Sequence, residues 1–333
     1  MDFSLPIRIL LLPLSWVYRV VVQCKAMLYA KGWLRKKRLK GAVISVGNLT
    51  VGGTGKTPMV LWLAEKFLGQ GKSVAILSRG YRGGQGDSDE VELMRRRLGG
   101  RARFGIGASR FDQGSSLEHS APVDVFVLDD GFQHQQLARD LDLVMLDGSK
   151  ELKNAWLLPA GPLREPLGAC RRADLLVVTR KFKGPPVEAC DSHRRQIFYA
   201  QTRLLGFRMF GCESVSESLR EIGPGPFYAF CGIGNPQAFV EDLERWRLTV
   251  AGSRKFRDHH RYSATDVLTI EAAALAAGAT GMVTTEKDEQ NLRGLNFRKL
   301  PVYVAVISFE ISAESEFTST VERLLSERQD RNS

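Results

Sequence analysis

A glycine-rich segment that ends in lysine and threonine carries the clearest chemistry in this sequence. It reads Gly-Asn-Leu-Thr-Val-Gly-Gly-Thr-Gly-Lys-Thr over residues 47–57, between the apolar run 42–46 and an apolar helical pattern over 58–67. Strand, glycine loop and helix in this order are the context of a Walker A loop, whose backbone N–H groups and lysine bind phosphates and whose final hydroxyl binds Mg²⁺. The predicted nucleotide-binding residues are Thr50, Val51, Gly52, Gly53, Thr54, Gly55, Lys56 and Thr57.

This loop departs from the strict Walker pattern at one position, where Thr50 replaces the first glycine. The alternative is a glycine turn that only joins a strand to a helix. Gly-Lys-Thr between a strand and a helix favours phosphate binding over that alternative. Pro58 fits the same interpretation, because a proline near the first helical position removes no helical hydrogen bond.

Two adjacent carboxylates follow a second candidate for a buried strand. The run Val-Asp-Val-Phe-Val-Leu at 123–128 is followed by Asp129, Asp130 and Gly131. Carboxylates at the carboxyl end of a parallel strand beside a phosphate loop are placed to bind Mg²⁺ or to orient a nucleophile. Successive strand residues point to opposite sides, so we expect different roles for the two aspartates. A turn that ends the strand explains one aspartate more easily than both.

Phosphoryl transfer to an alcohol is assisted by a group near the hydroxyl proton, and a carboxylate or a carboxylate-supported histidine can serve. The candidates are Asp89, in a Ser-Asp-Glu context, and His259, in an Arg-Asp-His-His context. From the residues alone, a surface acid and a loop histidine explain them equally well.

The elements that must position these residues form an α/β fold. Further apolar runs at 74–77, 141–146 and 174–178 are separated by helical or loop-like stretches. This alternation predicts a P-loop NTPase-like core with a mostly parallel sheet and helices on both faces. The Gly-Pro-Gly-Pro run at 223–226 predicts a hinge, followed by a strand at 227–230 and a helix near 236–246.

The predicted domains are therefore an N-terminal membrane-associating helix over 1–40, a P-loop core over 41–222 and a smaller C-terminal α/β domain over 223–333. His259 lies in the C-terminal domain and Lys56 in the P-loop core. We therefore expect the site in the cleft between these two domains, with the smaller domain closing over the nucleotide.

The N-terminal segment carries most of the charge. The net charge is +10, and residues 1–40 hold nine lysines and arginines against one acid. Basic residues confined to an apolar segment indicate anionic lipids before nucleic acid, so no nucleic-acid partner is expected. After Pro13, polar side chains recur every four positions at Ser15, Arg19 and Gln23, which is typical of an amphipathic helix in a membrane interface. A helix packed on the protein's own core is the alternative.

The sequence resembles the tetraacyldisaccharide 4′-kinases of Gram-negative bacteria. Six blocks in the same order carry the resemblance, and that family also has threonine at the first Walker position. They are Ser-Val-Gly-Asn-Leu-Thr-Val-Gly-Gly-Thr-Gly-Lys-Thr-Pro at 45–58, Leu-Ser-Arg-Gly-Tyr at 77–81, Leu-Asp-Asp-Gly-Phe-Gln-His at 128–134, Pro-Ala-Gly-Pro-Leu-Arg-Glu at 159–165, Asp-His-His at 258–260 and Thr-Thr-Glu-Lys-Asp at 284–288.

This resemblance implies ATP-dependent, Mg²⁺-dependent phosphorylation of the 4′-hydroxyl of a tetraacyl glucosamine disaccharide 1-phosphate in lipid A biosynthesis, at the cytoplasmic face of the inner membrane. It implies a lipid-linked substrate. From the basic N-terminal segment we expect an anionic membrane surface as a second partner, and no obligate protein partner is expected. The implied roles are Lys56 and Thr57 at the phosphates and metal, Asp129 in the metal site with Asp130 and Glu165 close to it, and Asp89 with His259 at the hydroxyl.

Some assignments stay open. The family's usual Gly-Asp-Glu-Pro block reads Ser-Asp-Glu-Val at 88–91, which leaves Asp87 as a competitor of Asp89. By charge alone, Arg79, Arg82 and Arg164 are candidates for binding the substrate's 1-phosphate or ATP, and equally for solvated surface residues.

Two other functions fit parts of the sequence. A GTPase is disfavoured because Thr-Arg-Lys follows the late strand candidate at 174–178 in place of the guanine-binding Asn-Lys-x-Asp run. An ATP-gated, membrane-associated assembly factor or switch without a small-molecule acceptor is the main alternative.

Overall fold

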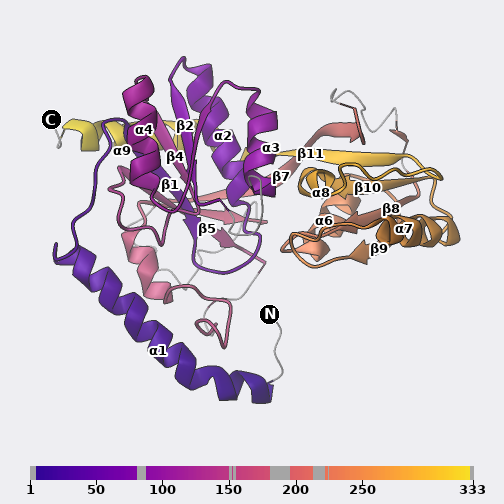
Figure 1. Ribbon diagram of the computed structural model, residues 1–333, viewed down its shortest axis with the longest axis horizontal. Helices are drawn as coiled ribbons and strands as arrows, with labels where there is room; N and C mark the ends of the chain where they lie inside the picture. Colours follow the sequence, from indigo (N-terminus) through magenta and orange to yellow (C-terminus); the bar gives the residue numbers. More distant parts are fainter. Residues whose placement is uncertain are drawn as a thin grey trace. The chain divides into compact units, whose positions relative to one another are not determined.

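The computed structural model describes residues 5–80, 88–149, 152, 155–180, 196–212, 222–223 and 225–330. The chain forms two compact units. Unit 1 comprises residues 1–85, 97–201 and 309–333, and unit 2 comprises residues 86–96 and 202–308. Figure 1 labels their helices and strands.

Unit 1 is built on a sheet in the order β3-β2-β4-β1-β5-β6-β7, with parallel pairing at each of these neighbours. The strands are β1 (Ala42–Asn48), β2 (Val74–Ser78), β3 (Arg103–Ile106), β4 (Val125–Asp129), β5 (Leu141–Asp147), β6 (Leu175–Thr179) and β7 (Gln196–Met209). The helices are α1 (Leu5–Ala30), α2 (Lys56–Gly69), α4 (Arg110–Ser120), the 3₁₀ helix η1 (Leu167–Arg172) and α9 (Glu314–Asp330).

Helices cover both faces of this sheet, as the apolar runs predicted. The connection through α2 runs from β1 outward to β2, whereas the connection through α4 returns from β3 to β4. Right-handed crossovers in opposite directions put their helices on opposite faces. β1, β2, β4, β5 and β6 are buried along their whole length, which explains why they read as uninterrupted apolar runs. The predicted fold class is confirmed.

Unit 2 has a smaller parallel sheet in the order β11-β10-β8-β9. Its strands are β8 (Phe227–Cys231), β9 (Val250–Lys255), β10 (Gly281–Thr285) and β11 (Val302–Ile311), and its helices are α3 (Asp89–Leu98), α6 (Pro236–Arg245), α7 (Ala264–Ala276) and α8 (Glu286–Asn291). Alternate residues of β8 serve two cores: Phe227 and Ala229 pack with Phe239 of α6, and Tyr228 and Phe230 pack with Ile270 of α7.

The boundaries of the units differ from the predicted domains. The 223–226 segment lies inside unit 2, and the chain crosses between units within β7 and within β11. Residues 86–96, which include Asp89, belong to unit 2, and α9 belongs to unit 1. At the two crossing points, 201/202 in β7 and 308/309 in β11, no glycine or proline marks the boundary, which is why the sequence indicated a hinge elsewhere.

Helix α1 is a single helix of 26 residues with Pro13 inside it. Ser15 is buried: its hydroxyl donates to Leu157 O at 3.1 Å and accepts from Ala160 N at 3.0 Å. Tyr18 donates its hydroxyl to Arg164 O at 2.9 Å. These residues fasten one side of α1 to unit 1. The exposed side is apolar and includes Ile9, Leu10, Leu14, Trp16, Val17, Val20 and Val21.

Candidate functional site

The predicted phosphate loop lies between β1 and α2, where a Walker A loop belongs. Gly55 caps α2 in the left-handed region, with φ of +85°, and Lys56 and Thr57 begin the helix. Gly47, near the end of β1, allows the turn after β4 to pack closely against it. A Cβ at residue 47 would lie 2.5 Å from Phe132 Cβ. Glycine is thus required at both positions, at Gly55 for the left-handed backbone and at Gly47 for close packing.

Thr50 occupies the position of the missing glycine, and its backbone explains the departure. It forms an antiparallel bridge with Leu163, and its neighbour Val51 donates its N–H to Pro162 O at 2.8 Å. Leu49 O accepts from Arg164 N at 2.7 Å. The start of the loop is therefore extended and pairs with the 162–164 segment. In an extended backbone, threonine is as suitable as glycine.

Lys56 is directed at Asp130. Its Nζ lies 3.6 Å from Asp130 Oδ1, and Arg164 Nη1 donates to both oxygens of the same carboxylate, at 2.9 and 2.7 Å. Asp130 has a φ of +50°, which turns it away from the line of β4. The lysine of the loop, the second aspartate and the arginine of the 159–165 block are thus brought together.

Asp129, the last residue of β4, is 3% exposed and pairs in register with Val46 of β1. Ser78, at the end of β2, donates its hydroxyl toward Asp129 Oδ2 at 3.4 Å. Thr57 is also buried. Hydroxyl and carboxylate oxygens are the donors that Mg²⁺ prefers, so the chemistry of Thr57 and Asp129 fits such an ion.

Glu165 is engaged by an arginine. Its carboxylate is 2% exposed and accepts from both terminal nitrogens of Arg172, at 2.7 and 3.0 Å. The guanidinium of Arg172 also lies over the ring of Phe132, 4.5 Å from its centroid. Among the described residues, no group of three or more His, Cys, Asp and Glu side chains is arranged to hold a metal ion.

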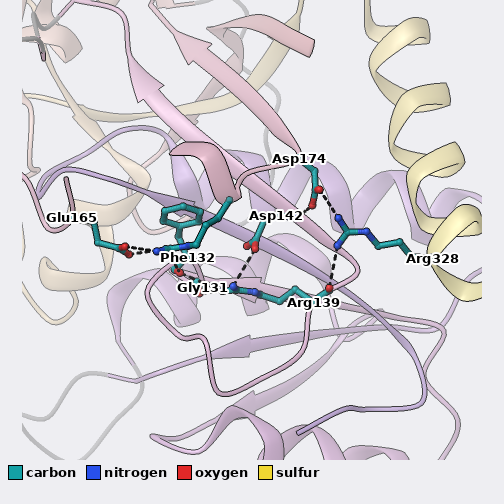
Figure 2. Close-up of polar contacts among 8 residues, drawn as sticks. Gly131, Phe132, Arg139, Asp142, Glu165, Asp174 and Arg328 are labelled. Atoms are coloured by element: carbon teal, nitrogen blue, oxygen red, sulfur yellow. Dashed lines mark hydrogen bonds and ion pairs between the residues drawn. The ribbon is translucent and has the colours of Figure 1, made fainter. Parts of the chain in front are cut away.

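Arginines also hold the turn that follows Asp130. Figure 2 shows Arg139 directed at Asp142 and Gly131, with Arg328 at Asp174. Arg139 Nη1 donates to Gly131 O at 3.1 Å and to Phe132 O at 3.2 Å, while its Nη2 lies 3.1 Å from Asp142 Oδ2. These contacts fix the backbone behind the two aspartates.

Two further residues lie near this group, and neither was assigned a role from the sequence. Arg110, the first residue of α4, is buried; burial lowers its pKa, and the charges of Asp130 and Asp129 oppose that shift. Burial, with the nearby charge of Arg110, lowers the pKa of His134 to about 4, so its imidazole is neutral at pH 7.

The predicted proton-accepting residues meet in unit 2. His259 Nδ1 lies 3.0 Å from Asp89 Oδ2, and Asn291 Nδ2 donates to the same oxygen at 2.8 Å. The hydrogen bond from His259 lowers the pKa of Asp89, and the same bond raises the pKa of His259. Both directions favour a carboxylate paired with an imidazolium. Asn291 is a third member that the sequence did not reveal.

Some predicted residues are not joined to these groups. Arg79 is exposed. Arg82 and the competitor Asp87 lie outside the described residues. Lys56 and the Asp89–His259 pair belong to different units.

Comparisons with known proteins identify the family of this chain. Residues 7–326 match the family described as tetraacyldisaccharide-1-P 4′-kinase. A tetraacyldisaccharide 4′-kinase from Geobacter sulfurreducens is 36% identical over 328 residues, covering 93% of this chain and 91% of the relative. One from Syntrophobacter fumaroxidans is 38% identical over 282 residues, covering 78% and 74%. A crystal structure of LpxK from Aquifex aeolicus in complex with ATP is similar with a TM-score of 0.73 at 30% identity, covering 96% of this chain and 99% of that one.

Proposed function

Because the chain belongs to the tetraacyldisaccharide 4′-kinase family, we propose that its P-loop binds ATP and that its Asp89–His259 pair activates the acceptor hydroxyl. The reaction is ATP-dependent phosphorylation of the 4′-hydroxyl of a tetraacyl glucosamine disaccharide 1-phosphate in lipid A biosynthesis. The relatives carry the name of a kinase, and none of the comparisons supports the alternative of an assembly factor without a small-molecule acceptor.

The loop residues Thr50, Val51, Gly52, Gly53, Thr54, Gly55, Lys56 and Thr57 surround the phosphates in this proposal. Lys56 already lies beside a carboxylate, Asp130, which holds the ammonium group at the start of α2. Negative charge on the phosphate oxygens attracts that ammonium group and the N–H groups of the helix start. Such prepositioned positive charge stabilises the charge that develops in phosphoryl transfer.

Mg²⁺ would be held by Thr57 and Asp129. When bound, the ion would neutralise charge on the phosphate oxygens. Asp130 and Glu165 are each paired with an arginine, Arg164 and Arg172, so we place them around the metal site as residues that fix its arginines and backbone. Direct ligation of the metal by either carboxylate would require breaking its ion pair with the arginine.

The Asp89–His259 pair takes the proton from the 4′-hydroxyl in this proposal. Since the carboxylate holds Nδ1, the imidazole keeps a fixed orientation. The form of His259 that accepts this proton is the neutral imidazole. The raised pKa of His259 makes that form a stronger base, and the ionised Asp89 stabilises the imidazolium formed. The hydroxyl oxygen then bonds to the γ-phosphorus as the bond to the ADP oxygen breaks. Because the two units supply different parts of this reaction, closure of unit 2 over the bound nucleotide is part of the proposal.

We propose that the N-terminal helix binds a membrane. The segment Pro6–Ala30 has the length and composition to cross a bilayer, and only 6% of its most apolar part is buried. Ser15 and Tyr18, however, fasten one side of the helix to unit 1. A helix that is attached along one side and apolar along the other suits the membrane interface, where the neighbouring basic residues meet anionic lipids. We therefore place the enzyme at the cytoplasmic face of the bacterial inner membrane, as a peripheral or monotopic protein.

The observation that carries the residue roles is the contact between Asp89 and His259. Its test is a comparison of Asp89→Asn and His259→Gln with the unaltered protein. Both variants should bind ATP with an unchanged Kd, measured with a fluorescent ATP analogue, and should lose about 100-fold or more of kcat with the lipid acceptor. A weakened ATP affinity with an unchanged kcat would assign the pair to nucleotide binding instead.

A further inference from the structure

The block Thr-Thr-Glu-Lys-Asp at 284–288 has no role in the reaction described above. It spans the end of β10 and the start of α8, a helix of six residues in unit 2. Three of the six helical residues are buried, although all three are acids: Glu286, Asp288 and Glu289. Buried carboxylates are costly unless they accept hydrogen bonds, so their partners indicate what the helix does.

The last residue of α8 reaches Asp89. Asn291 Nδ2 donates to Asp89 Oδ2, the same oxygen that contacts His259 Nδ1. An amide donor and an imidazole nitrogen on one oxygen leave the carboxylate little freedom to rotate. The hydrogen bond from Asn291 also lowers the pKa of Asp89, after the larger contribution of His259.

The middle of α8 reaches the backbone of His259 through one intermediate. Asp288 is 1% exposed, and its Oδ1 accepts from Gly232 N at 2.6 Å and from the Tyr262 hydroxyl at 2.7 Å. Gly232 O in turn accepts from His259 N at 3.0 Å. His259 has a φ of +59°, a conformation that a non-glycine residue adopts only where its surroundings impose it.

Further contacts of α8 hold α3, the helix that begins with Asp89. Lys287 pairs with Glu90 at 2.5 Å, and Glu289 pairs with Arg96, two residues from the end of α3. Glu289 also pairs with Arg208 of β7. The helix that carries Asp89 is therefore fastened near both of its ends.

We propose that α8 is the positioning element of the catalytic pair, with Asn291 fixing the carboxylate of Asp89 and Asp288 fixing the backbone of His259 through Gly232. This inference rests on the proposed role of the pair. Neither Asn291 nor Asp288 is required to touch the substrate: their effect on the rate passes through Asp89 and His259.

The first test replaces Asn291 by aspartate, which has nearly the same shape but donates no hydrogen bond and repels Asp89. We expect kcat to fall about tenfold or more, because a hydrogen bond to a charged group is lost and a like charge is added. KM for ATP should stay within about twofold. The matched control is Arg293→Ala, which breaks a neighbouring contact with α3, the exposed pair with Glu92. It should leave kcat unchanged.

The second test follows the pKa of His259 by NMR titration of the imidazole, assigned by its absence in His259→Gln. The charged groups that act on this ring are Asp89, Lys287, Asp258 and Glu90. In Asp288→Ala, Gly232 N and the Tyr262 hydroxyl lose their acceptor. The backbone that holds His259 is then less fixed, so the pKa of His259 should fall toward that of a free histidine. If that variant does not fold, Tyr262→Phe removes one of the same hydrogen bonds and should lower the pKa in the same direction.

The outcomes separate this inference from the proposed function. Loss of kcat in Asp89→Asn with unchanged kcat in Asn291→Asp would overturn the positioning role and leave the pair in place. Normal kcat in both Asp89→Asn and His259→Gln would overturn the pair and the positioning role together. An unchanged His259 pKa in folded Asp288→Ala or Tyr262→Phe would contradict the role of Asp288 in fixing His259. If Arg293→Ala lost as much kcat as Asn291→Asp, any weakened contact with α3 would lower the rate. That result would contradict a specific positioning role of Asn291.

Discussion

His259 Nδ1 and Asp89 Oδ2 lie 3.0 Å apart, although 170 positions separate the two residues in the chain. The hydrogen bond between them lowers the pKa of Asp89 and raises the pKa of His259. Both side chains keep some contact with solvent, with 24% of Asp89 and 38% of His259 exposed. The pair is therefore held by the fold and still open to a reactant.

These pKa directions predict how stability depends on pH. The depressed pKa of Asp89 contributes stability above its unfolded value of about 3.9, and this is lost as the pH falls through the folded pKa. The raised pKa of His259 contributes stability below its unfolded value of about 6.5, and this is lost as the pH rises through the folded pKa. The difference in free energy of unfolding between the unaltered protein and His259→Gln should thus be largest between about pH 4 and 6.5.

Urea unfolding of both proteins at pH 5.5 and 8.5, at equal ionic strength, measures this difference. It should shrink at the higher pH. A difference that grows with pH would show that His259 is neutral beside Asp89 and would reverse the assignment of charge.

Lys56→Ala should reduce turnover below about a tenth of the unaltered rate, because a cation beside the transferred phosphate is lost. The matched control is Lys66→Ala in the same helix, whose Nζ pairs with Glu314 2.9 Å away at an exposed position. Removing an exposed pair changes stability little, so turnover there should stay normal. Steady-state ATP consumption with the lipid acceptor measures both. Equal rates in the two variants would remove Lys56 from the phosphate site.

Gly47→Ala should disrupt the phosphate loop, since the added Cβ would lie 2.5 Å from Phe132 Cβ and 2.7 Å from Phe132 N. Overpacking against backbone should lower the free energy of unfolding by about 1–3 kcal/mol and weaken ATP binding. Gly69→Ala is the control, because no atom lies within 4 Å of its added Cβ. That change in α2 should be neutral or slightly stabilising. Denaturant titrations compare the two, and tolerance of alanine at Gly47 would show that the turn after Asp130 can move.

The exposed face of α1 should bind membranes. Leu10→Asp with Trp16→Asp places charge on side chains that are 78% and 66% exposed. Because these residues touch little of unit 1, the change should leave the melting temperature intact and weaken sedimentation with anionic vesicles about tenfold or more. Leu268→Asp, at a 60% exposed leucine of α7, is the control and should bind vesicles normally. Equal binding by all three proteins would reject α1 as the membrane contact.

The core of the fold could be predicted because its strands are buried on both faces. β1, β2 and β5 read as plain apolar runs, and each was placed to within two residues at its ends. β7 and β11 could not be recognised in the same way, because their burial is mixed along the strand. A sequence pattern also does not reveal which unit a strand continues into, so the unit boundaries were missed.

The residues of the site, too, were predictable only in part. The phosphate loop is local in sequence, so spacing alone placed Lys56 and Thr57 at the start of α2. Asp89 and His259 meet through tertiary structure, and only a family resemblance paired them in advance. Asn291 was not foreseen, because an exposed-looking asparagine after an acidic stretch has no spacing that indicates a partner 202 positions away.

The central claim is transfer of the γ-phosphate of ATP to a lipid-linked sugar hydroxyl, and one measurement tests it most directly. The full chain in anionic vesicles is incubated with γ-labelled ATP and a tetraacyl glucosamine disaccharide 1-phosphate, and the products are separated by chloroform extraction. We predict that the label appears in the chloroform-soluble disaccharide, and that His259→Gln and Lys56→Ala strongly reduce the rate at which it appears there. Label released only as inorganic phosphate would contradict the assignment.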